Sequence, residues 1–157
     1  MNPQLLWSLL VDRFIGMLVA LVVLGFGNSF ARADATADEW KSLAGTWKVE
    51  SAKLNGEDGM DFFKTLVLTM EEGKYKVEVN GMADIGTLKF DLAKKPKQMT
   101  IVGTDGTNKG RTHYAIYELD KDTLKICYAL DGKDAPAGFE SKVGSMTLLV
   151  TYKREKK

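Results

Sequence analysis

The sequence predicts an all-β protein: a single antiparallel up-and-down β-barrel of about eight strands, preceded by a short N-terminal helix. Short segments with alternating apolar and polar residues follow one another closely between residues 45 and 152, and Asn, Asp and Gly gather in the turns. No segment there is long enough for the helix that a parallel crossover needs. A two-sheet sandwich is the alternative. We prefer the barrel, because pairing of the first and last strands removes both sheet edges.

The first strand is expected to begin at Gly45 and to end at the turn dipeptide Asn55-Gly56. Trp40 and Leu43, just before it, are spaced for a turn or so of helix, which Gly45 ends. Residues 57–63 form a connection with an apolar edge and room for one helical turn. Further strands are expected at residues 65–70, 74–79, 84–92, 98–102, 112–119, 123–130 and 145–152, with longer loops at 103–110 and 131–144.

The N-terminus carries the features of a secretory signal peptide. Arg13 precedes an uncharged apolar run at residues 14–26, and Ala31-Arg32-Ala33 matches a small-x-small cleavage site. The run is short for a membrane span of about 20 residues. We therefore predict cleavage after Ala33, a barrel domain at residues 34–157, and export to the periplasm or the cell exterior. An uncleaved anchor is the alternative.

The charge balance argues against a nucleic-acid partner, and the cysteine content excludes an intramolecular disulfide. Without residues 1–33, basic and acidic side chains are equal in number, which argues against nucleic acid as a partner. We expect a monomer that does not insert into a membrane after cleavage. The single cysteine, Cys127, allows no intramolecular disulfide, so stability must come from the core, and we expect it to be a small strand residue.

The sequence holds few groups suited to catalysis. His113 is the only histidine, and it has no cysteine or tight carboxylate cluster beside it, so we expect a surface or barrel-rim residue, no metal site and no enzyme. Glu71-Glu72 and Asp120 with Asp122 lie in predicted turns, where carboxylates are solvated. The glycine-containing loop 103–110 lacks the context of a phosphate loop and the spacing of an EF-hand, and no cofactor is expected.

The barrel interior is the remaining candidate site. One face of the strands supplies apolar residues that either line a pocket for an apolar ligand or fill the core, and a one-residue shift of register would change the set. A cavity of about 300 Å³ or more would favour ligand binding, and a smaller one a filled core. The candidate ligand-binding residues are Val49, Leu68, Val77, Leu88, Phe90, Ile116, Tyr128 and Leu148.

Gly45-Thr46-Trp47 at the start of the first strand resembles the Gly-x-Trp motif of lipocalins and the wider calycin group. The resemblance implies that Trp47 closes the barrel floor and that Arg154, near the end of the last strand, packs across it; Gly45, Trp47 and Arg154 would then be structural closure residues. An indole offers a broad face to a planar guanidinium.

Residues 40–154 also resemble an uncharacterised lipocalin-like domain family of planctomycete bacteria. Many members of that family carry Arg-Pro before the Phe, whereas this chain has Ala135-Pro136-Ala137-Gly138-Phe139. If that Arg serves a shared site, this protein lacks it. The family has no established activity to carry over. The matching pieces are Leu43 to Val49 with Asn55-Gly56-Glu57, Tyr117 to Tyr128, Phe139-Glu140-Ser141 and Lys153-Arg154.

Two functions therefore fit the sequence. The first is an exported, non-enzymatic lipocalin-like protein that binds a small apolar or amphipathic molecule inside the barrel. The second is a cell-envelope interaction protein with a filled core, which recognises its partner through the loops 57–63, 103–110 and 131–144.

Overall fold

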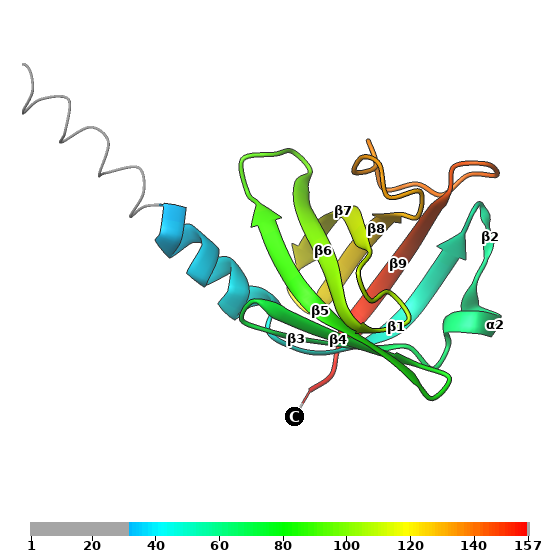
Figure 1. Ribbon diagram of the computed structural model, residues 1–157, viewed down its shortest axis with the longest axis horizontal. Helices are drawn as coiled ribbons and strands as arrows, with labels where there is room; N and C mark the ends of the chain where they lie inside the picture. Colours follow the sequence, from blue (N-terminus) through cyan, green and yellow to red (C-terminus); the bar gives the residue numbers. More distant parts are fainter. Residues whose placement is uncertain (1–31, 157) are drawn as a thin grey trace, which may run out of the picture. The chain divides into compact units, whose positions relative to one another are not determined.

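The computed structural model describes residues 32–156. Eight antiparallel strands form a closed barrel in which each strand pairs with the next and β9 pairs with β1 (Figure 1). This closure confirms the predicted all-β barrel and excludes the two-sheet sandwich. The barrel strands are β1 (Gly45–Leu54), β3 (Val67–Glu71), β4 (Lys74–Val79), β5 (Met82–Asp91), β6 (Lys97–Gly106), β7 (Thr112–Asp120), β8 (Thr123–Ala129) and β9 (Thr147–Arg154).

Three further elements lie outside the barrel strands. The short β2 (Glu57–Asp58) pairs with the end of β1, and α2 (Met60–Phe63) forms one helical turn in the connection predicted there. An N-terminal helix spans residues 32–43, longer than the single turn expected. Residues 39–157 form one compact unit that contains the barrel, and residues up to 38 belong to a separate unit.

The hairpin turns follow from glycine and asparagine in the left-handed backbone region. Asn55 and Gly56 have φ of 51° and 90°, and Asn80 and Gly81 have φ of 50° and 78°. Two successive positive φ values define the turn whose twist matches that of antiparallel strands, and Asn-Gly adopts it at low cost. The strand bounds agree closely with the predicted ones at β4, whereas β6 continues to Gly106, into the segment expected to be a loop.

Trp47 and Arg154 close one end of the barrel, called the floor below. Trp47 is fully buried, and its Nε1–H donates to the Leu43 carbonyl at 2.9 Å. The Arg154 guanidinium lies over the indole, 4.1 Å from its centroid, while Nη1 and Nη2 donate to the carbonyls of Ala44 at 2.7 Å and Ser42 at 2.6 Å. One side chain thus ties the last strand to the first and to the end of the helix.

Aromatic side chains fill the barrel directly beside this closure. The ring of Phe90 lies 4.5 Å from that of Trp40 and 5.4 Å from that of Tyr117, measured between centroids. The Tyr117 hydroxyl donates to Glu39 at 3.0 Å, and Lys97 forms an ion pair with the same carboxylate at 2.7 Å. Burial, followed by the neighbouring Glu39 charge, raises the pKa of Tyr117. The floor half of the barrel is therefore packed and not hollow.

The predicted apolar segment at residues 14–26 lies outside the described residues. The predicted cleavage site after Ala33 falls within the helix at residues 32–43, and cleavage remains a prediction. Among residues 32–156, no helix has the length and hydropathy to span a membrane.

We predict that Arg154→Ala lowers the free energy of unfolding by about 2 to 3 kcal/mol, because it removes two charge-assisted hydrogen bonds and the contact with Trp47. Thermal denaturation followed by circular dichroism would show a midpoint roughly 5 to 10 °C lower. Arg154→Lys should lower the midpoint by a smaller amount, since an ammonium keeps the charge but lacks the planar fork of donors. Lys153→Ala, at the neighbouring exposed position, should change stability little. An unaltered midpoint in Arg154→Ala would contradict the closure role.

Candidate ligand-binding cavity

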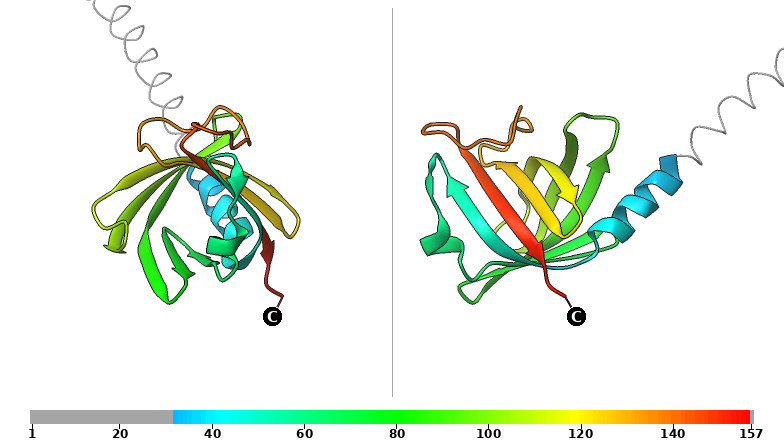
Figure 2. Two further views of the ribbon diagram at one scale, coloured as in Figure 1. Left: turned by 90° about the vertical axis from the view of Figure 1, so that its right-hand side faces the viewer. Right: turned by 180° about the vertical axis from the view of Figure 1, so that it is seen from behind.

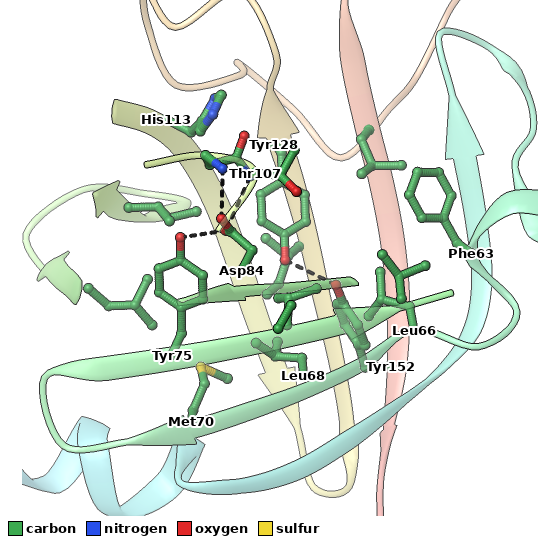
Figure 3. Close-up of a pocket in the computed structure, with 18 of the residues that line it drawn as sticks. Phe63, Leu66, Leu68, Met70, Tyr75, Asp84, Thr107, His113, Tyr128 and Tyr152 are labelled. Atoms are coloured by element: carbon green, nitrogen blue, oxygen red, sulfur yellow. Dashed lines mark hydrogen bonds between the residues drawn. The ribbon is translucent and has the colours of Figure 1, made fainter. Parts of the chain in front are cut away.

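A cavity of about 280 Å³ occupies the barrel half opposite the floor (Figure 3). We call this open end the mouth; it is bordered by α2, the turn 80–81, the loop 107–111 and the loop 130–146. The left view of Figure 2 shows the barrel from the side on which α2 lies. The cavity extends from mouth residues such as Phe63 and Leu130 to Met70 and Met99, which are almost fully buried.

The cavity wall is mostly apolar. No lysine or arginine of residues 32–156 lines it, and its ionisable side chains are Asp84, His113 and three tyrosines. Such a wall favours apolar or uncharged contents over ions, because burying an unpaired charge costs several kcal/mol. The apolar lining residues along the strands include Leu66, Leu68, Met70, Val77, Leu88, Met99, Ile101, Ile126 and Leu148.

The structure brings five of the eight candidate residues to the cavity: Leu68, Val77, Leu88, Tyr128 and Leu148. Val49 and Phe90 are partly buried against the core cluster and do not line the cavity.

Ile116 requires a correction, because it does not belong to the barrel interior. On β7 the residues in the core or cavity are His113, Ala115, Tyr117 and Leu119. Ile116 therefore points to the outer face, where it pairs with Cys127. Both are fully buried because the loop after β8 covers this face: the Cys127 thiol lies 3.5 Å from the Glu140 carbonyl. Burial also raises the pKa of this thiol. With both faces of β7 apolar, alternation alone cannot identify the inner one.

Asp84 organises a polar cluster at the mouth that the sequence did not reveal. Its carboxylate accepts hydrogen bonds from the Tyr75 hydroxyl at 2.8 Å, from the Asn108 backbone N–H at 2.8 Å and from Asn108 Nδ2 at 3.1 Å (Figure 3). Tyr75 faces Gly86 on β5, where a Cβ would lie 2.5 Å from the phenol ring. Gly86 therefore leaves the space in which Tyr75 reaches Asp84, and Asp84 holds the loop 107–111 at the cavity.

Two further tyrosines form a pair inside the cavity. The hydroxyls of Tyr128 and Tyr152 lie 3.1 Å apart and hydrogen-bond to each other (Figure 3). Desolvation raises the pKa of Tyr128 to about 12 and that of Tyr152 well above its usual value. Desolvation, aided by the hydrogen bond to Asp84, likewise raises the pKa of Tyr75. These phenols are neutral hydrogen-bonding groups at physiological pH.

His113 lies at the start of β7 and lines the cavity, but both of its imidazole nitrogens are buried without a hydrogen-bond partner. Within residues 32–156, these are the buried side-chain nitrogen or oxygen atoms that lack a partner. It thus lies at the barrel rim, one of the two positions expected from the sequence, with its polar atoms shielded from solvent. No cluster of three or more His, Cys, Asp or Glu side chains in the described part of the chain is arranged to hold a metal ion.

We predict that Asp84→Ala loosens the loop 107–111, because three donors lose a charged acceptor. Hydrogen exchange followed by NMR should show the Asn108 and Lys109 amides exchanging roughly tenfold faster, while amides of β8 and β9 keep their protection. Asp105→Ala, an exposed carboxylate on the adjacent strand, is the matched control and should leave these rates unchanged. Equal exchange in both variants would contradict the holding role of Asp84.

The comparisons with known proteins leave the family open. No family model matches the chain, and no curated protein does. One solved structure that is similar is a DUF4847 family protein from Bacteroides vulgatus ATCC 8482, with 13% sequence identity and a TM-score of 0.46. The match covers 74% of this chain and 96% of that one. The closed eight-strand antiparallel barrel itself fits a lipocalin-like fold.

Proposed function

We propose that this chain is an exported, non-enzymatic binding protein that holds a small apolar or amphipathic molecule in the mouth half of its barrel. The observation that carries the proposal is the cavity of about 280 Å³, whose wall is apolar and whose polar groups are few. A concave apolar site with a small number of placed polar groups is the usual form of a small-molecule site.

The size of the cavity limits what it can hold. Its volume lies slightly below the 300 Å³ that separates the two functions considered from the sequence, so by that criterion volume alone favours a filled core. Binding is supported instead by the apolar wall and its few polar groups. A cavity of about 150 Å³ holds benzene, and by proportion this one would hold roughly ten to twelve non-hydrogen atoms. The ligand we propose is therefore one ring with a short chain, or a short aliphatic amphiphile. A longer molecule would extend through the mouth.

We also propose the family and the location that the sequence indicates. Membership of the planctomycete lipocalin-like family is supported by the motif at Gly45 and Trp47 and by the position of Arg154 over the indole. Export is supported by the apolar run at residues 14–26 and the Ala31-Arg32-Ala33 site. The absence of nucleic-acid binding remains a proposal from the charge balance, and monomeric behaviour remains a separate proposal.

We predict that Val77→Trp, which adds a large ring to the cavity wall, weakens binding of propylbenzene at least tenfold in isothermal titration calorimetry. Glu78→Trp places the same ring at the adjacent exposed position and should stay within twofold of the unmodified protein. Val77→Phe is the smaller replacement if the tryptophan variant fails to fold. If propylbenzene does not bind the unmodified protein, and native mass spectrometry of protein purified from its host finds no small molecule, the proposed function is wrong.

A second function is favoured by a different observation: the exposed large apolar side chains of residues 32–156 gather toward the mouth and none lies in the floor turns. Val143 is 82% exposed and Phe62 67% exposed. Such clustering is typical of surfaces that contact another molecule. A cell-envelope partner recognised through the mouth loops is therefore the second candidate. The residues are Phe62, Met82, Ile85, Leu130, Val143 and Met146.

We predict that a photo-reactive amino acid at position 143 cross-links a partner protein in intact cells of the host, if this second function holds. The matched control is the same amino acid at position 72, an exposed site in the floor turn between β3 and β4. A discrete adduct at 143 and none at 72, identified by mass spectrometry, is the expected result. Equal labelling at both positions would contradict a specific mouth surface.

A further inference from the structure

We infer that the ligand of this cavity is uncharged and carries one hydrogen-bonding group, such as a hydroxyl, which pairs with His113 near the mouth while its apolar part lies deeper among the strands. This inference rests on the proposed binding function and specifies its ligand class. The unpartnered imidazole at the cavity wall carries it.

The burial of the His113 imidazole without hydrogen bonds is energetically unfavourable. A neutral imidazole offers one donor and one acceptor, and here both nitrogens are shielded from water and from other polar atoms. A buried polar group without a partner costs about 1 to 3 kcal/mol, so nearly all such groups in folded proteins are paired. Because the side chain already lines the cavity, a rotation of the ring would present a nitrogen to a molecule held there.

The other buried polar groups of the wall have partners, and Thr107, a further polar lining residue, is exposed. Asp84 accepts three hydrogen bonds, from Tyr75 and Asn108, and one of the hydroxyls of Tyr128 and Tyr152 donates to the other. Among the described residues, His113 is the lining side chain whose polar atoms are all buried without any partner. A ligand group that pairs with it gains a hydrogen bond and removes the cost of an unpaired imidazole, whereas a purely apolar ligand leaves that cost in place.

The charges at the wall disfavour an anionic ligand. No lysine or arginine of the described residues lines the cavity, so a carboxylate would find no permanently charged cationic partner there, and the carboxylate of Asp84 would repel it. A cation would be drawn to Asp84, but the oxygens of that carboxylate are already engaged by three donors. A neutral hydroxyl is neither repelled by Asp84 nor dependent on its oxygens. The ligand class that fits is therefore an alcohol or a phenol.

The test compares three ligands of one shape by calorimetry: para-propyltoluene, para-propylphenol and para-propylbenzoate. The first two have the same number of non-hydrogen atoms and differ in one methyl or hydroxyl group. In the unmodified protein we expect the phenol to bind about fivefold to tenfold more tightly than the hydrocarbon, and the benzoate to bind at least tenfold more weakly than the phenol. A tighter benzoate would overturn the uncharged class.

His113→Phe keeps a flat ring and removes both nitrogens. The preference for the phenol over the hydrocarbon should fall to less than twofold, while para-propyltoluene itself binds as well as before, which also reports that the cavity has folded. His113→Gln, which restores a donor and an acceptor, should recover part of the preference. A phenol preference that survives in His113→Phe would overturn the inference while leaving the binding function intact. Failure of all three ligands to bind the unmodified protein would instead remove the binding function.

Discussion

The contact between Arg154 and Trp47 stabilises the closure of the barrel. Because the guanidinium both covers the indole and donates to the carbonyls of Ala44 and Ser42, it holds together three segments that are far apart in the chain: the helix end, β1 and β9. The pairing of β1 with β9 then removes the sheet edges and encloses an interior. An arginine suits this position because its fork can bind two carbonyls while its plane faces a ring.

The closure also decides where an interior space remains. Large rings at the floor, from Trp40, Trp47, Phe90 and Tyr117, fill that half of the barrel, so the cavity is confined to the mouth half. There the side chains are mostly apolar, and no lysine or arginine of the described residues lines the space. The cavity is therefore suited to small neutral molecules, and its chemistry depends on the few polar groups near the mouth.

Strand order, turn positions and several strand limits could be predicted because they depend on local physics. Asn80-Gly81 favours a tight hairpin by backbone conformation alone, and the alternation around Val77 marks one face of β4 as buried. The inner face of β7 could not be predicted in the same way, because a loop distant in sequence buries Ile116 from outside. The role of Asp84 could not be predicted either, because its partners Tyr75 and Asn108 come from other parts of the chain.

The sequence by itself determined the all-β class and the order of the strands, because alternation and turn conformation are properties of short segments. The closure set of Gly45, Trp47 and Arg154 followed only from the resemblance to lipocalins, because Trp47 and Arg154 are far apart in the chain. Tertiary structure alone decided how much of the barrel is filled, which of the candidate residues line the space, and that the nitrogens of His113 have no partner. Those outcomes depend on side-chain volumes and hydrogen bonds summed across strands that are distant in the chain, and no single segment carries that information.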